Sequence, residues 1–353
     1  MKRYVFLAVV IGTIVFFYVR RQNENYYDLL IVSGATPLAV EKKVPLNYLL
    51  TVKGLVKKEY RFSGSALNGF AATRIRTREF SPDGRYQGAY AYSGIPVFHI
   101  LEGIAPEKPE SSAFKQPQDM LVTFTAATGE KVCFGYNELL MVDDRHPVTL
   151  AYDREQLLPT NEKVRETYRL NLNSVPLSGL RLICPREPDT TRYLDNVVSI
   201  TYSLLPVPED LLPVRRKAIN CESGAIICIQ GRDTGTAVVK DLPVLRNDRW
   251  IRIGHGHGFD GVVTLEGYAL RSFLEANFPG TTGSDFFLFV SCDGYRCLFS
   301  GREIFSTMDG RDMMIARALN GQPPKEGLML VPAADFFHDR AMWGLSHIVL
   351  LRL

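Results

Sequence analysis

A segment in the first half of the chain, Ser93-Gly94-Ile95-Pro96-Val97-Phe98-His99-Ile100-Leu101-Glu102, returns in the second half as Glu266-Gly267-Tyr268-Ala269-Leu270-Arg271-Ser272-Phe273-Leu274-Glu275. Each copy consists of a glycine, an apolar entry and a short amphipathic helix. A chain that encodes one structural unit twice is expected to fold as two units of the same kind. This repeat therefore decides the fold prediction.

Two further landmarks follow in the same order in both halves. Thr128-Gly129-Glu130-Lys131-Val132 with Phe134 and Glu138-Leu139 matches Asp293-Gly294-Tyr295-Arg296-Cys297 with Phe299 and Glu303-Ile304. Gly179 to Ile183, with Arg192 and Ile200, matches Gly327 to Val331, with Arg340 and Ile348. We expect one domain over residues 45–205 and a second over 222–353, with a linker in the proline-containing segment between them.

The composition is that of a globular protein. Of the 353 residues, 46% are hydrophobic and 22% are charged, which is enough apolar material for two ordinary cores. The net charge is only +3, and no basic run is interleaved with aromatic residues. The sequence therefore argues against a nucleic-acid-binding protein.

Residues 1–24 are predicted to be a membrane anchor. Tyr4 to Val19 carries no charge and is flanked by Lys2-Arg3 and Arg20-Arg21. At about 1.5 Å per residue such a helix reaches roughly 24 Å, a short span that interfacial aromatic residues can complete. A signal peptide is the alternative, but no small-residue cleavage site follows. We expect an uncleaved signal anchor in the cytoplasmic membrane with the folded part in the periplasm or another extracytoplasmic space, although the balanced basic flanks do not fix the orientation.

Short apolar runs and period-two patterns dominate the rest of the chain and predict strands. The predicted strands are Tyr48 to Val52, Met120 to Phe124, Leu180 to Ile183, Val197 to Tyr202, Ile226 to Ile229, Phe286 to Val290 and His347 to Leu351. Helices are predicted at Val97 to Gly103, Ala269 to Asn277 and Arg311 to Leu319. The fold class is therefore α+β with mixed, irregular sheets.

Two cysteine pairs are candidate disulfides. Cys292 and Cys297 flank a predicted hairpin turn, and Cys221 and Cys228 border Gly224. The alternative is that these cysteines are small apolar core residues with free thiols. No CxxC pair occurs, so a structural zinc site is not predicted.

The landmarks, taken together, resemble the molybdopterin-binding domain of the sulfite oxidase family. That domain has an opening strand that ends in a glycine turn, as in Thr51 to Val56, and then an aromatic residue before Gly-Val-Pro-Leu and a short helix, as in Tyr92 to Leu101. An Asp-Gly-Tyr turn follows, as in Asp293-Gly294-Tyr295 and more loosely in Thr128-Gly129-Glu130. Its end resembles Leu180 to Pro185 with Arg192-Tyr193, and Leu328 to Pro332 with Arg340. The resemblance implies two tandem domains of this fold.

The sequence departs from that family at the metal ligand. The family's enzymes hold molybdenum through a cysteine thiolate just before the Gly-Val-Pro helix, because a soft, high-valent metal needs a sulfur donor there. The corresponding segments, Arg76 to Tyr92 and Ile253 to Leu265, contain no cysteine. We therefore expect no cofactor, with a retained molybdopterin or a divalent transition metal as the alternatives.

His255, His257 and Asp260 are the candidate metal ligands, because they lie where the second copy would carry its cofactor ligand. Glycines on both sides would let the backbone turn so that the two imidazoles converge. The alternative is a solvated glycine-rich loop.

Arg76, Arg78 and Arg252 are the candidate cofactor-binding residues, since arginine suits a phosphate through its planar fork. A solvated strand face is the alternative, because residues two apart on a strand point the same way. Arg192 and Arg340 are interpreted as structural arginines that lie over the last strand with their heads in water.

The sequence thus favours a membrane-anchored, extracytoplasmic binding or assembly module whose molybdenum site is lost. Its expected partners are the membrane, through the N-terminal helix, and a protein in a membrane or periplasmic redox complex. The alternative is a sulfite-oxidase-like oxidoreductase that keeps a molybdopterin or uses another metal through His255 and His257. A small-ligand binder that reuses the emptied pocket is a third possibility.

Overall fold

The structure, a computed structural model, describes residues 43–141, 145–165, 177–215 and 225–353. The chain divides into two units, Met1–Lys43 and Val44–Leu353. The predicted anchor over residues 1–24 lies outside the described residues. Within the described residues no helix has the length and apolar character needed to cross a membrane.

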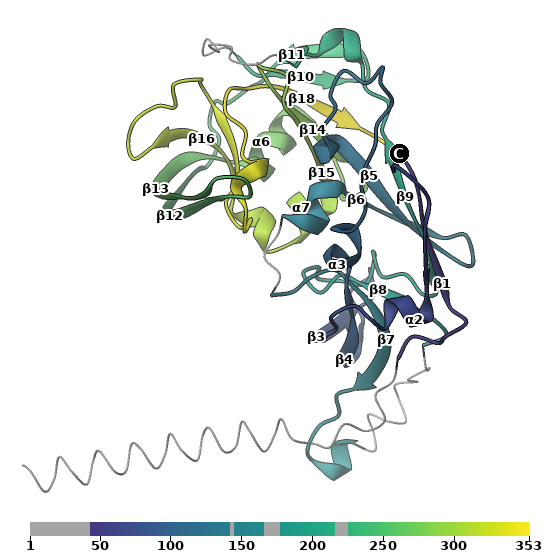
Figure 1. Ribbon diagram of the computed structural model, residues 1–353. Helices are drawn as coiled ribbons and strands as arrows, with labels where there is room; N and C mark the ends of the chain where they lie inside the picture. The colour runs from purple at the N-terminus through teal and green to yellow at the C-terminus, as the bar shows by residue number, and fades with distance from the viewer. Residues whose placement is uncertain (1–42, 142–144, 166–176, 216–224) are drawn as a thin grey trace, which may run out of the picture. The chain divides into compact units, whose positions relative to one another are not determined.

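The unit Val44–Leu353 is a mixed α+β structure made mostly of small, irregular sheets, which confirms the predicted fold class (Figure 1). The first half contributes a five-stranded sheet with the order β2-β1-β9-β5-β6 and a four-stranded sheet with the order β3-β4-β7-β8. Their strands are β1 (Leu49–Gly54), β2 (Tyr60–Ser63), β3 (Thr73–Phe80), β4 (Tyr86–Pro96), β5 (Met120–Ala126), β6 (Lys131–Gly135), β7 (Thr149–Gln156), β8 (Arg181–Ile183) and β9 (Val197–Leu204).

The second half contributes a five-stranded sheet with the order β11-β10-β18-β14-β15 and a four-stranded sheet with the order β12-β13-β16-β17. Its strands are β10 (Ile227–Gln230), β11 (Asp233–Thr236), β12 (Val244–Gly254), β13 (Gly258–Ala269), β14 (Phe286–Ser291), β15 (Arg296–Ser300), β16 (Met313–Leu319), β17 (Met329–Pro332) and β18 (Leu345–Leu351).

The two halves share their strand order and their irregularities. In each five-stranded sheet the first strand of the half pairs in parallel with the last, β1 with β9 and β10 with β18. In each four-stranded sheet a register shift falls at the landmark glycine, before Gly94 on β4 and before Gly267 on β13. The three sequence landmarks therefore occupy equivalent places in the two halves.

Short helices connect the strands. They are α2 (Gly64–Leu67), α3 (Val97–Leu101), α4 (Tyr136–Leu140), α6 (Leu270–Asn277) and α7 (Gly301–Ser306), with 3-10 turns η1 (Pro117–Asp119), η2 (Glu209–Leu211), η3 (Asp309–Arg311) and η4 (His338–Arg340). The helix predicted at Arg311 to Leu319 is wrong, because that segment forms η3 and then strand β16. Met313 to Ala316 are buried one after another, between the neighbouring strands β13 and β17. Sheet pairing overrides the helix propensity of these residues.

Each half has its own apolar core, and a third cluster joins them. Leu121 of β5 packs with Leu288, Leu298 and Leu351 of the second half. The strand β14 is buried along its whole length, so both faces of the second five-stranded sheet are covered at this strand. Strands β6 and β15 contact each other at the boundary (Figure 1).

Neither predicted disulfide forms. Cys297 and Cys228 are free thiols in the core. Cys292 takes part in a disulfide bond, but not with Cys297, and Cys221 lies outside the described residues. The side chain of Cys297 points into the apolar core of the second half, which explains why the predicted pair across the turn is not made.

Candidate functional site

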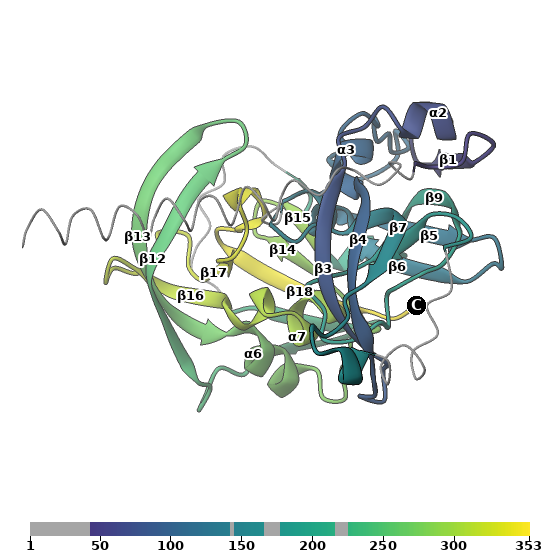
Figure 2. The same ribbon diagram turned by 90° about the horizontal axis from the view of Figure 1, so that it is seen from below.

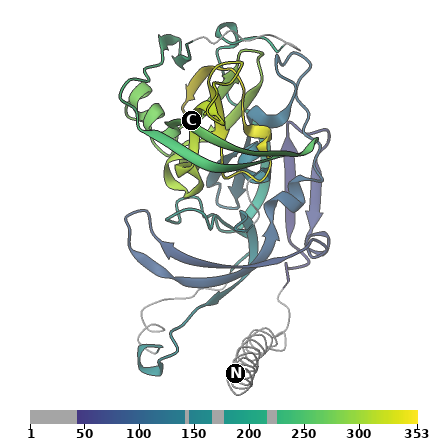
Figure 3. The same cartoon turned by 90° about the vertical axis from the view of Figure 1, so that its left-hand side faces the viewer.

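The predicted metal ligands lie at the tip of a long hairpin. His255 and His257 occupy the turn between β12 and β13, and both are exposed, as is Asp260. Figures 2 and 3 show this hairpin in green. Among the described residues, no group of three or more His, Cys, Asp or Glu side chains is placed to hold one metal ion.

The structure joins the hairpin tip to the 3-10 turn η4. Asp260 contacts Arg252 at 3.2 Å and His338 Nε2 at 3.4 Å. The backbone N–H of His255 donates to Asp339 at 2.9 Å. The candidate cofactor-binding residue Arg252 thus belongs to an ion pair that joins the two strands of the hairpin, β12 and β13.

A hollow of about 450 Å³ opens beside η4. Its lining includes Asp293 and Tyr295 of the landmark turn, together with His338, Asp339 and Trp343. The predicted hairpin tip therefore borders this hollow through its contacts with His338 and Asp339. Because three carboxylates, one of them Glu326, face one arginine and one histidine, its lining carries excess negative charge at neutral pH.

The arginines of the first half lie on the corresponding hairpin, β3–β4. Arg74, Arg76 and Arg78 are exposed on one face of β3, and Thr77 and Glu79 are buried on the other. Arg74 pairs with Glu155 of β7, whereas neither Arg76 nor Arg78 forms an ion pair with another described residue. These two side chains are free to meet an anion from solvent.

The donors on these two hairpins do not fit a molybdenum site of the sulfite oxidase kind. The described free cysteines are Cys133, Cys184, Cys228 and Cys297, and none lies on β3–β4 or β12–β13. These hairpins therefore do not offer the thiolate ligand that the sequence resemblance implies.

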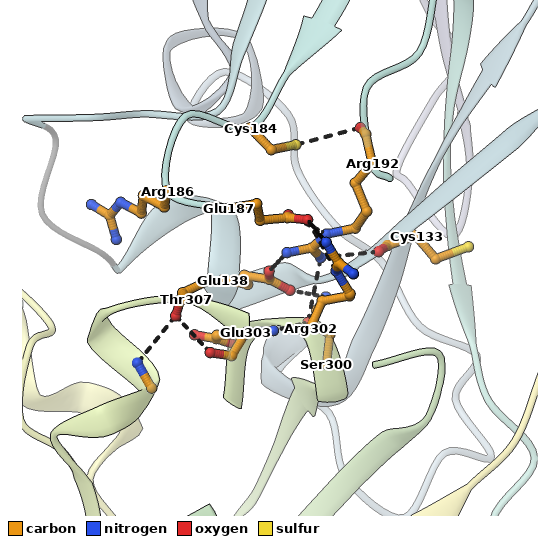
Figure 4. A network of polar contacts seen from close by, with 12 residues as sticks. Cys133, Glu138, Cys184, Arg186, Glu187, Arg192, Ser300, Arg302, Glu303 and Thr307 are labelled. Atoms are coloured by element: carbon orange, nitrogen blue, oxygen red, sulfur yellow. Dashed lines mark hydrogen bonds and ion pairs between the residues drawn. The ribbon is translucent and has the colours of Figure 1, made fainter. Parts of the chain in front are cut away.

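The most elaborate polar arrangement is a buried ion network at the boundary of the two halves (Figure 4). In the first half, Arg192 donates from Nε to Glu187 at 2.6 Å and from Nη2 to Glu138 of α4. Its guanidinium also lies 4.1 Å from the centroid of the Phe134 ring. Arg192 is buried, so each of its charged neighbours is needed to offset the loss of hydration.

The second half repeats this arrangement. Arg340 donates from Nε to Asp335 at 2.6 Å, and its Nη1 lies 2.6 Å from Glu303 Oε1. Its guanidinium lies 4.5 Å from the centroid of Phe299. Glu138 and Glu303 are each the third residue of their helix, α4 and α7. Arginine, acid and aromatic residue therefore occupy equivalent places in both halves, and the interpretation of Arg192 and Arg340 as arginines with solvated heads is wrong.

Contacts between the halves connect the two clusters. Arg302 of α7 donates to Glu187 at 3.0 Å and to Asp189 at 2.6 Å. Ser300, the N-cap of α7, accepts from the backbone of Glu303 at 3.0 Å and from Arg192 Nη1 at 3.3 Å. Arg186 reaches Asp309 at 2.7 Å. The network therefore ties the loop after β8 to the first turns of α7.

A small pocket of about 30 Å³ lies beside the network. Its lining includes Glu138, Cys184, Arg192, Glu303 and Thr307. A pocket of this size has room for about two water molecules, given that one needs about 10–15 Å³ by this measure. It is too small for an organic cofactor.

Sequence reasoning found only half of this network. Glu138, Glu303, Arg192 and Arg340 were visible as repeated landmark residues. The contact between each arginine and the acid of its own half was not predicted. The repetition of opposite charges at matched positions in the two halves is the sequence signal that could have indicated it.

No protein-family model matches the chain, and no curated protein matches it. Among solved structures, the sulfane dehydrogenase SoxCD from Paracoccus pantotrophus is similar at 14% sequence identity, over 87% of this chain and 79% of that chain, with a TM-score of 0.30. A likeness of this size supports no statement about activity or cofactors.

Proposed function

We propose that this protein is a binding or assembly module, anchored in the cytoplasmic membrane by its N-terminal segment and folded in the extracytoplasmic space. It is built from two tandem copies of a sulfite-oxidase-like domain, over residues 45–205 and 222–353, and it carries no molybdenum. Its partner is a protein of a membrane or periplasmic redox complex.

The observation that carries the proposal is the surface of the β12–β13 hairpin. Ile251, Phe259 and Val262 are exposed there, and Phe259 is 68% accessible to solvent. Apolar side chains grouped on a surface are typical of protein interaction sites. The absence of cysteine from the described β3–β4 and β12–β13 hairpins argues against the oxidoreductase alternative.

Site-specific photocrosslinking in cells tests the binding role. A photoreactive residue at Phe259 or Val262 should capture one partner, whereas the same residue at exposed Leu46 of the first half should not. The captured protein must then bind the purified full chain, and the substitution Phe259→Ser should weaken that binding at least tenfold. Equal capture from all three positions would contradict the proposed surface.

Elemental analysis with a pterin fluorescence assay tests the cofactor part of the proposal. We expect no stoichiometric molybdenum or pterin in protein purified without a chelator. Stoichiometric molybdenum with pterin would overturn the cofactor-free assignment. Zinc, copper or iron that is lost on replacing His255 and His257 with alanine, but kept on replacing exposed His146, would instead assign the hairpin tip as a metal site.

A further inference from the structure

Glu303 differs from the other acids of the buried network in its hydrogen bonding. Its side chain is 3% exposed, and neither carboxylate oxygen has a hydrogen-bond partner among the described residues. Arg340 Nη1 lies 2.6 Å from Oε1, but the two groups are not aligned for a hydrogen bond. Glu303 lines the small pocket beside the network. A buried carboxylate without hydrogen bonds is strongly destabilised relative to the neutral acid.

Glu138, the equivalent residue of the first half, accepts hydrogen bonds at both carboxylate oxygens, whereas Glu303 accepts none among the described residues. One of its oxygens accepts from Arg192 Nη2 and the other accepts from the backbone N–H of Gly135 at 3.3 Å. In the second half, Ser300 stands at the N-cap position that Gly135 occupies, and its hydroxyl caps the helix instead. Glu303, at the third position of α7, therefore does not take part in capping its helix.

The charges of the network are unequal. The network acids whose side chains are at most 19% exposed are Glu138, Glu187, Asp189, Glu303 and Asp335. The cations within the same limit are Arg186, Arg192, Arg302 and Arg340. One negative charge is left over, and a low-dielectric interior does not tolerate it.

Every element packed around Glu303 contributes ionisable groups. They are Arg302 on its own helix, Cys297 on β15, Glu138 on α4, Cys184, Arg186, Glu187 and Arg192 in the loop after β8, Asp309 on η3, and Asp335 and Arg340 at η4. Burial raises the pKa of both thiols, so Cys184 and Cys297 stay neutral near pH 7. The two thiols therefore neither add to the surplus negative charge of the network nor compensate it.

We propose that Glu303 is protonated at neutral pH. Its neutral carboxyl group stabilises the boundary between the two halves, and loss of the proton at higher pH removes this stabilisation. The neutral carboxylic acid donates its O–H to a water molecule in the pocket, and loss of the proton places a second carboxylate charge on Arg340, close to Glu138 and Asp335. The boundary then loosens, because like charges at close range repel in the interior.

The direction of the Glu303 pKa agrees with this geometry. Burial raises the pKa to about 8, the Arg340 charge opposes the rise, and Glu138 and Asp335 add to it. Since the folded-state pKa lies above that of the unfolded chain, the stabilisation is complete below about pH 4.5 and is lost as the pH rises to about 8.

Urea unfolding of the full chain in detergent, compared with Glu303→Gln, tests the proposal. Glutamine keeps the shape of the side chain without a titrating proton. We expect the ratio of the wild-type unfolding constant to that of the variant to rise by up to about tenfold per pH unit between pH 5 and 8, and then to level off. A ratio that stays constant over this range would overturn the proposal.

Infrared spectroscopy provides a second test that does not depend on the variant's stability. The carbonyl band of a protonated carboxyl group should be present in the wild type at pH 6.5 and should decrease by pH 9.5. Glu303→Gln should remove that titrating component, whereas the control Glu59→Gln, which replaces an exposed acid, should keep it. An unchanged band in the wild type, or its survival in Glu303→Gln, would exclude a protonated Glu303.

Discussion

Two arginines, Arg192 and Arg340, are buried with their guanidinium groups between two carboxylates and an aromatic face. A buried ion pair of this kind contributes little relative to an apolar replacement of the whole group, but removal of one member leaves the others uncompensated. The arginines are therefore the residues on which the boundary depends most.

Replacement of Arg340 by methionine is expected to lower the free energy of unfolding by about 3–5 kcal/mol, because Asp335 would lose its bidentate partner in the core. The fall should be smaller at low pH, where Asp335 can be protonated and its charge no longer needs Arg340. Urea unfolding measures both effects. The matched control is Arg61→Met, whose ion pair with Glu59 is exposed and should change little. Equal losses in the two variants would contradict the role of the buried arginine.

The four free thiols should react in an order set by burial. Burial raises the pKa of Cys228 to about 11 and that of Cys297 to about 12, while Cys133 is partly exposed on β6. The thiolate is the reactive form, so iodoacetamide at pH 8 should label Cys133 first and Cys297 only after unfolding. Mass spectrometry of the native protein reads out the order. Labelling of Cys297 as fast as Cys133 would show that the core opens at the boundary.

At the scale of the element, the landmark glycines allow close contact between strands. A side chain at Gly267 would bring its Cβ within 2.2 Å of the Ile315 carbonyl oxygen, and at Gly94 within 2.6 Å of the Leu150 carbonyl oxygen. Both contacts involve backbone atoms, which cannot move aside cheaply. The repeated glycine is therefore a requirement of the bulged pairing of β4 with β7 and of β13 with β16.

Gly267→Ala is expected to destabilise the protein by about 1–3 kcal/mol through this overpacking. Gly256→Ala is the matched control, since no atom lies within 4 Å of its Cβ position and its backbone does not require glycine. Thermal unfolding monitored by circular dichroism compares the two. A loss for Gly256→Ala as large as that for Gly267→Ala would contradict the contact explanation.

The sequence predicted elements well where the local pattern and the fold agree. The strand β14 and the helices α3 and α6 were recognised from five to eight apolar or amphipathic residues. The strand β16 was misread, because methionine, alanine and leucine favour helices locally and only pairing with β13 and β17 makes the segment a strand. The β12–β13 hairpin is predicted to bear metal ligands because His255 and His257 lie where the second copy would carry its cofactor ligand. Its contacts with η4 could not be predicted, because η4 lies far away in the sequence.

At the scale of the whole molecule, the apolar cluster and the ion network cross the boundary between the halves. The candidate site could not be predicted, because Arg302 meets Glu187 only when the two halves pack together. We expect calorimetry to show one cooperative unfolding transition for Val44–Leu353.

Reversal of a charge at the boundary tests whether the two halves unfold together. Arg302→Glu should separate the single transition into two, because it places a further acid beside Glu187 and Asp189. Arg246→Glu on the exposed β12 hairpin serves as the control and should leave one transition. Two transitions in the wild type would show that the halves unfold independently.

The parallel pairing of the first and last strands of each half has a consequence for synthesis. Thr51 of β1 pairs with Ser199 of β9, so the central strand of the first sheet is made about 150 residues after the strand beside it. At about 5–20 residues per second, a nascent chain waits roughly ten to thirty seconds before this sheet can close. During that time its apolar strands are open to wrong pairing. Production of the protein should therefore depend on chaperones that hold the growing chain, and codon changes that slow translation between β1 and β9 should lower its yield.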